Sequence, residues 1–220
     1  MLKTIVKAGP ITNLTDARYF AAREVAWLSF DFNSGSETYI QPQMMSAIKE
    51  WVDSVKFVGE FGMASAAEIR QLTEQLQLDA LQVGMFTDLE TLVDLQSSVP
   101  VMKEIIIEKE TTSEQITEQL ELFQPWVQIF ILDFAKNGVT WADLQKSEMF
   151  STAQLRSWCE RFPVMFCIDF QKEMLNDFLH VLQPLGLCVK GGAEEKTGYK
   201  SFDELDEIFD LLEEPEQFEE

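Results

Sequence analysis

The chain alternates eight times between a short β-rich run and a longer segment whose apolar residues recur at helical spacing. Several β-rich runs are almost continuously apolar, such as Ile129-Phe130-Ile131-Leu132, which indicates strands buried on both faces. Strands that alternate with helices pair in parallel through helical crossovers. Eight such repeats in 220 residues predict an α/β fold, a single closed (β/α)8 barrel known as a TIM barrel. A doubly wound open sheet is the competing interpretation.

The expected strands are Leu2–Lys7, Ala26–Phe32, Val55–Phe61, Ala80–Gly84, Val101–Glu108, Val127–Asp133, Pro163–Ile168 and Gly186–Lys190. The expected helices are Leu14–Glu24, Gln43–Val52, Ser65–Leu76, Leu89–Leu95, Thr112–Phe123, Thr152–Arg161, Lys172–Leu182 and Phe202–Leu212. Asn13 or Thr15 can cap the first helix, because a short side-chain oxygen accepts a free N–H of the first turn.

No linker divides the chain, so we expect one barrel domain over residues 1–214. Pro215 ends the last helix, and residues 215–220 form an acidic C-terminal tail. We expect this tail to be a solvated end, and partner binding is the alternative role.

The charge of the chain excludes several kinds of partner. Lys and Arg total 17 against 38 Asp and Glu, a formal net charge of -21, which opposes binding to nucleic acid and to anionic membrane surfaces. No apolar run is long enough to span a membrane. The odd cysteine count, with no metal-ligand spacing, favours a reducing, cytoplasmic setting. With His180 as the only histidine, we expect no metal site and no cofactor.

Sequence motifs along the whole chain resemble those of one family. Val6-Lys7-Ala8-Gly9-Pro10-Ile11-Thr12-Asn13 resembles Lys-Ile-Cys-Gly-Ile-Thr-Asn at the end of the first strand of phosphoribosylanthranilate isomerase, a (β/α)8 barrel of tryptophan biosynthesis. Further matches follow in order at Ser36-Glu37-Thr38-Tyr39-Ile40-Gln41-Pro42, Phe57-Val58-Gly59-Glu60-Phe61, Leu78-Asp79-Ala80-Leu81-Gln82-Val83-Gly84, Val101-Met102-Lys103-Glu104-Ile105, Ile131-Leu132-Asp133, Gly138-Val139-Thr140-Trp141 and Val189-Lys190-Gly191-Gly192-Ala193-Glu194.

This resemblance implies a small-molecule ligand at the barrel mouth and a monomer or homodimer. The family's reaction is an Amadori rearrangement, in which a general acid opens a phosphorylated aminoaldose and a general base removes the proton at C2. Asp133 stands at the position of the acid, and Gly9 stands at the position of the catalytic cysteine base. The ligand-binding positions implied by the resemblance are Lys7, Gln82, Lys103, Gly191 and Gly192.

The chain departs from the family pattern at the base and at both anion contacts. Gly9 has no side chain, and loss of a base alone lowers a rate by roughly 10² to 10⁴. Thr38 replaces the arginine that contacts the substrate's carboxylate. Cys167-Ile168-Asp169-Phe170 replaces a glycine-rich phosphate turn, so Asp169 should repel phosphate and leave that position empty. The Gly191-Gly192 turn and Lys190 retain half of the phosphate cradle.

Other carboxylates are candidates for a replacement base. Glu60 and Glu104 lie within apolar runs, and Lys103 adjoins Glu104. Strand alternation predicts that one residue of each adjacent pair points outward, where it forms a salt bridge at most. The functional alternative is a buried glutamate whose pKa is raised. We expect Cys167 and Cys188, on neighbouring strands, to be inert buried thiols.

Three functions therefore remain open. The chain is a family member that has lost the isomerase reaction and binds another ligand or has another role, or it is a working isomerase with a rearranged site. The third possibility is a different enzyme built on Asp133 with Glu60 or Lys103. All three interpretations place Asp133, Gly9, Lys103 and Gly192 around one mouth of the barrel.

Overall fold

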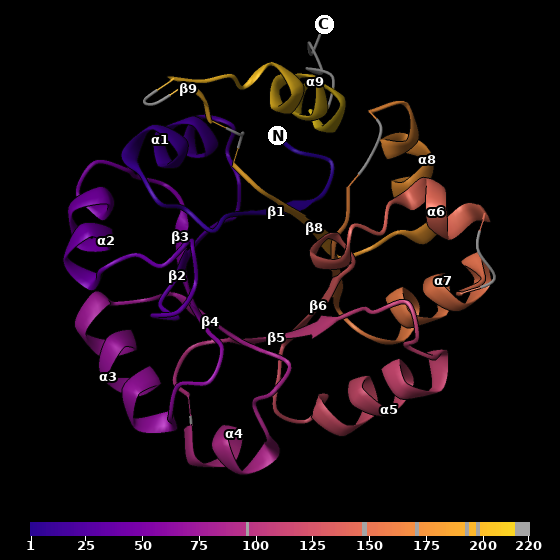
Figure 1. Cartoon of the computed structure of the whole chain (residues 1–220), viewed down its shortest axis with the longest axis horizontal. Coiled ribbons are helices and arrows are strands. Elements are labelled where there is room, and N and C mark those ends of the chain that lie inside the picture. The colour runs from indigo at the N-terminus through magenta and orange to yellow at the C-terminus, as the bar shows by residue number, and fades with distance from the viewer. Residues whose placement is uncertain (96, 147–148, 170–171, 192–193, 197–198, 214–220) are drawn as a thin grey trace, which may run out of the picture.

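The computed structural model describes residues 1–95, 97–146, 149–169, 172–191, 194–196 and 199–213. Within these ranges eight parallel strands close into a barrel in sequence order, and helices surround it (Figure 1). The strands are β1 Ile5–Ala8, β2 Trp27–Asp31, β3 Lys56–Phe61, β4 Ala80–Val83, β5 Val101–Ile106, β6 Ile129–Asp133, β7 Val164–Cys167 and β8 Gly186–Val189. The predicted (β/α)8 barrel is confirmed, and the open sheet is excluded by the pairing of β1 with β8.

The helices lie close to the predicted ranges. They are α1 Leu14–Ala22, α2 Pro42–Lys49, α3 Ala66–Leu76, α4 Leu89–Leu95, α5 Ser113–Phe123, α6 Trp141–Lys146, α7 Thr152–Arg161, α8 Lys172–Leu182 and α9 Asp203–Leu212. Asn13 is the N-cap of α1, because its side chain accepts the amide N–H of Asp16 at 3.0 Å.

Four short elements were not expected from the sequence. A 3-10 turn, Ala135–Asn137, and helix α6 both lie between β6 and β7, and the small β9 (Glu194–Lys196) and β10 (Tyr199–Lys200) pair precedes α9. Each is too short to show a hydrophobic period. The predicted acidic tail, residues 215–220, lies outside the described residues.

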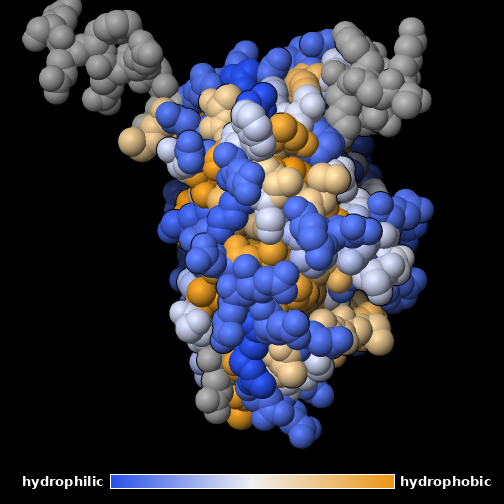
Figure 2. Space-filling view, turned by 90° about the vertical axis from the view of Figure 1, so that its left-hand side faces the viewer, coloured by the Kyte–Doolittle hydropathy of each residue, from blue (hydrophilic) through white to orange (hydrophobic). Residues whose placement is uncertain are grey.

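The apolar core has two parts. The larger lies between the strands and the surrounding helices, and the smaller fills the lumen of the barrel with side chains that include Val58, Ala80, Met102, Ile131 and Met165. The side of the molecule that carries α1, α2 and α3 is mainly hydrophilic, with apolar residues scattered over it (Figure 2). No helix among the described residues is long and apolar enough to cross a membrane.

Lys103 lies on β5 but faces the helix layer. Its two neighbours on β5, Met102 and Glu104, face the lumen. The Lys103 ammonium donates to three carbonyl oxygens of the loop between β4 and α4, those of Gly84, Met85 and Thr87, at 3.0 to 3.3 Å. Burial lowers the pKa of Lys103 to about 8, against the attraction of Glu104 and Asp88. The side chain therefore holds a mouth loop in place.

We predict that Lys103→Met lowers the free energy of unfolding by about 2–4 kcal/mol, since three carbonyl groups lose a charged donor. Urea unfolding measures the loss. Lys109→Met, at an exposed position just beyond the same strand, is the control and should stay within about 0.5 kcal/mol of the parent. Equal effects of the two changes would contradict the anchoring role of Lys103.

Candidate ligand site at the barrel mouth

The backbone at Gly9 leaves no room for a side chain. Gly9 follows β1 with a φ of +147°, a conformation that other residues rarely adopt. A Cβ atom at this position would lie 2.1 Å from Ser29 Oγ and 2.8 Å from the Ser29 carbonyl oxygen. Both distances are far below van der Waals contact, so a cysteine does not fit this backbone.

An ion pair fills the lumen beside Gly9. Lys7 Nζ lies 2.6 Å from Glu60 Oε1 and donates to Ser29 Oγ at 2.9 Å. The two charged side chains are 5% and 13% exposed. Burial by itself disfavours the charged amine, but the attraction of Glu60 outweighs it and raises the pKa of Lys7. Glu60 thus points inward, and its carboxylate is paired with Lys7.

A second charged group lies across the mouth at the ends of β5 and β6. Lys136, in the 3-10 turn, bonds Glu104 Oε1 at 2.6 Å and lies 3.8 Å from Asp133 Oδ2. The Lys136 amide also donates to Asp133 Oδ1 at 2.9 Å. Gln82 Nε2 approaches Glu104 Oε1 at 3.4 Å. Asp133, at the acid position, is 3% exposed and adjoins a lysine.

Glu104 is the perturbed carboxyl of this group. Burial raises its pKa, and the attraction of Lys136 only partly opposes that effect. The charges of Glu60 and Asp133 raise the pKa further. Its side chain is 10% exposed and borders a cavity, so it can hold or release a proton beside a ligand.

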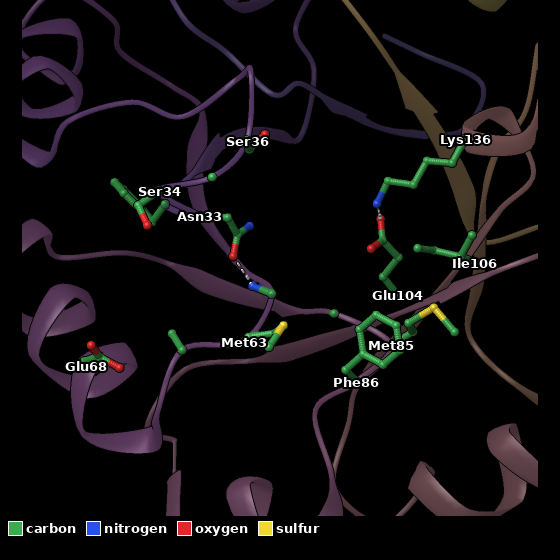
Figure 3. Close-up of a pocket in the computed structure, with 15 residues that line it drawn as sticks. Asn33, Ser34, Ser36, Met63, Glu68, Met85, Phe86, Glu104, Ile106 and Lys136 are labelled. Atoms are coloured by element: carbon green, nitrogen blue, oxygen red, sulfur yellow. Dashed lines mark hydrogen bonds and ion pairs between the residues drawn. The ribbon is translucent and has the colours of Figure 1, made fainter.

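The cavity, of about 590 Å³, opens among the loops after β2, β3 and β4 (Figure 3). Asn33 and Met63 lie on one side of it, and Glu104 and Lys136 lie on the other. Its lining also includes Phe32, Met85, Phe86 and Ile106, so apolar surface surrounds a charged patch. This combination suits a small amphipathic ligand.

The loop after β2 holds a carboxylate where the family resemblance implies a carboxylate-binding arginine. Thr38 Oγ1 donates to Asp31 Oδ2 at 2.8 Å. Asp31 Oδ1 accepts the backbone amide of Asn33 at 2.9 Å. Asp31 is 5% exposed, at the carboxyl end of β2. The local charge is therefore negative.

A smaller cavity, of about 290 Å³, lies at the ends of β7 and β8, where the resemblance implies a phosphate site. Asp169, Lys190 and Glu204 are the charged residues that line it. Gly191 lies against α1, since a Cβ atom there would be 2.9 Å from Asp16 Oδ2. Gly192, the other glycine of this turn, lies outside the described residues.

Cys167 and Cys188 lie in register on β7 and β8. Burial raises the pKa of Cys188 to about 12 and raises that of Cys167 well above its ordinary value. Both thiols therefore stay protonated and weakly reactive at neutral pH. No group of three His, Cys, Asp or Glu side chains within the described ranges could hold a metal ion.

The structure brings most of the sequence-predicted residues to one end of the barrel. Lys7, Gln82, Asp133 and Gly191 lie at or just inside the same mouth. The predicted ligand contact of Lys103 does not form there, because its side chain faces the helix layer outside the lumen and anchors a mouth loop. Lys136 and Asp31 were missed. Asp31 carried a usable signal, because it ends a predicted strand, but the contact of Lys136 with Glu104 joins separate strands and leaves no local pattern.

We predict that Gly9→Cys lowers the free energy of unfolding by about 2–4 kcal/mol, because the new side chain overlaps Ser29 at a left-handed φ. Thermal and urea unfolding measure the loss. Gly35→Cys is the matched control, because no heavy atom lies within 4 Å of a Cβ built there. If Gly9→Cys were as stable as the control, the backbone at position 9 would have to differ from the one described.

A second prediction concerns the pH dependence of stability. The folded state holds the Glu104 proton more tightly than the unfolded state, so this group's contribution to stability falls as pH rises above 4.5. We expect the stability of Glu104→Gln to rise relative to that of the parent as pH increases above 4.5. Urea unfolding across a pH series tests this, and a stability difference that stays constant with pH would contradict it.

Comparisons with known proteins place the chain in a family. The sequence matches the family described as N-(5'phosphoribosyl)anthranilate (PRA) isomerase over residues 6–211. The phosphoribosylanthranilate isomerase of Thermus thermophilus is 24% identical, with a TM-score of 0.74, and the match covers 94% of this chain and 98% of that one. The Thermotoga maritima isomerase is 20% identical, with a TM-score of 0.75 and coverage of 93% and 96%.

A third solved structure is of a phosphoribosylanthranilate isomerase in complex with reduced 1-(o-carboxyphenylamino)-1-deoxyribulose 5-phosphate. It is 20% identical, with a TM-score of 0.74 and coverage of 94% and 96%. The search of curated proteins finds no match. Because the family match runs through nearly the whole barrel, the chain belongs to the phosphoribosylanthranilate isomerase family.

Proposed function

We propose that this chain is a small-molecule-binding barrel of the family that no longer carries out the isomerase reaction. The observation that carries the proposal is the closed backbone at Gly9, where a Cβ atom would lie 2.1 Å from Ser29 Oγ. The position that resembles the family's general base has neither a side chain nor the space for one.

The groups around this position do not replace the base. Glu60, an inward carboxylate beside this position, is bound to Lys7 at 2.6 Å. An ion-paired carboxylate is a weak base, since proton uptake would break the pair. Asp133 stands at the position that the resemblance implies for the general acid. An acid alone can protonate the substrate but cannot remove its C2 proton, so the reaction stops halfway without a base.

The charges of the mouth also disfavour the family's substrate. The ligand named for the third solved structure carries a carboxylate and a phosphate. This chain has Asp31 beside Thr38 in the β2 loop and Asp169 with Glu204 in the β7–β8 cavity. Asp31 at one place, and two carboxylates against the single Lys190 at the other, would repel a ligand that carries both a carboxylate and a phosphate.

Glu104 supports a second candidate, a proton-transfer enzyme of a different reaction type. Its raised pKa and its place at the edge of the 590 Å³ cavity suit a general base, with Asp133 and Lys136 beside it. In this candidate Glu104 takes the place that the sequence suggested for Glu60 or Lys103. The cytoplasmic setting and the choice between monomer and homodimer stay predictions.

We predict that the chain does not restore growth without tryptophan to a bacterial strain that lacks phosphoribosylanthranilate isomerase, because the base is absent. A family member that keeps the cysteine is the positive control, and an immunoblot shows that both proteins are made. Growth that Asp133→Asn abolishes would contradict the proposal and establish a working isomerase with a rearranged site. A direct assay of the purified protein should agree with the growth result.

A further inference from the structure

The inward-facing charges at the mouth are predominantly negative. Among the described residues, the carboxylates that ring the lumen and the two cavities are Asp31, Glu60, Glu68, Glu104, Asp133, Asp169 and Glu204. The ammonium groups there are those of Lys7, Lys136 and Lys190. Asp31, Glu104 and Asp133 are each less than a tenth exposed. Buried carboxylates destabilise a fold unless cations or hydrogen-bond donors compensate them.

Gln82 lies beside Glu104 in the lumen but does not line the cavity. Its side chain projects into the lumen from β4 and is 5% exposed, and its Nε2 lies 3.4 Å from Glu104 Oε1. Its Oε1 is buried and has no hydrogen-bond partner among the described residues. A buried carbonyl oxygen without a donor is unfavourable, so the lumen beside Glu104 holds one more unsatisfied acceptor among the described residues.

Lys136 pairs with Glu104, but its position allows another cation to replace it. Its ammonium bonds Glu104 Oε1 at 2.6 Å, yet 45% of its side chain is exposed and it borders the cavity. Because its side chain is half-exposed, Lys136 can turn into solvent and be hydrated there, so leaving the pair does not bury its charge. A ligand cation can therefore take its place on Glu104.

Apolar side chains surround this acceptor-rich patch. Met63, Met85 and Phe86 line the same cavity as Glu104 (Figure 3). Phe86 is 76% exposed and Met63 is 87% exposed. Aromatic rings and thioethers pack against apolar groups, and aromatic faces also attract organic cations.

We propose that this cavity binds an organic amine in its cationic form. The ligand's ammonium group donates to Glu104 in place of Lys136, and its apolar part packs on Met85 and Phe86, which line the same cavity. The inference deepens the proposed function by naming a ligand class for the same cavity. It does not depend on the outcome of the growth experiment, because amine binding is measured on the purified protein.

Three probes of nearly equal shape and different charge test the proposal by calorimetric titration at neutral pH and low salt. They are 2-phenylethylamine, which is cationic, 2-phenylethanol, which is neutral, and phenylacetate, which is anionic. We expect the amine to bind more tightly than the alcohol by about tenfold or more, and phenylacetate to bind most weakly. Added salt should weaken amine binding.

Substitutions test whether the amine binds at Glu104. Glu104→Gln should weaken amine binding about tenfold or more and leave the affinity for 2-phenylethanol nearly unchanged. Lys136→Met should strengthen amine binding, because it removes the internal competitor. Glu121→Gln is the control: Glu121 lies on the outer helix α5, 2.5 Å from Arg161, and its loss changes the net charge equally. That variant should bind all three probes as the parent does.

Several results would overturn the proposal. These are no detectable amine binding, binding of phenylacetate as tight as that of the amine, or amine affinity that Glu104→Gln and Glu121→Gln change equally. The proposal that the isomerase reaction is lost fails separately. Its failure would show as growth without tryptophan, whatever the probes bind.

Discussion

The buried ion pair between Lys7 and Glu60 determines what the rest of the mouth can do. Two charges inside a barrel lumen are tolerated only as a pair, and losing one partner typically costs about 3–5 kcal/mol. The same lysine donates to Ser29 Oγ, which in turn lies 3.3 Å from the carbonyl oxygen of Ala8. Ser29 is thereby held against the position where a side chain on Gly9 would project. The ion pair and the closed base position are parts of one arrangement.

The charged groups on the opposite half of the mouth are held less firmly. Asp133 and Glu104 share Lys136, but this lysine is half-exposed and comes from a short turn, whereas Lys7 is rigidly placed on β1. One half of the mouth is thus locked and the other can exchange partners. Ligand recognition, in our proposal, belongs to the exchangeable half, where Glu104 and the cavity lie.

The sequence predicted the fold well because the apolar runs and their spacing carry most of the information about a barrel. It predicted the location of Asp133 because that residue directly follows Ile131-Leu132 at the end of a strand. It could not decide which of Lys103 and Glu104 faces inward, since both lie within one apolar run and alternation fixes only that they point oppositely. Lys136 joins Glu104 across strands, and such a contact follows from register and not from local pattern.

The geometry at position 9 also bears on how this barrel can evolve. A single substitution that restores a cysteine meets Ser29 Oγ and the Ser29 carbonyl oxygen at once. Shortening Ser29 would remove only the first overlap, because the carbonyl belongs to the backbone of β2. A cysteine at position 9 therefore requires coordinated changes in two neighbouring strands. Either change alone leaves one of these overlaps in place, so substitutions on the other side of the mouth meet less steric resistance than a side chain at position 9.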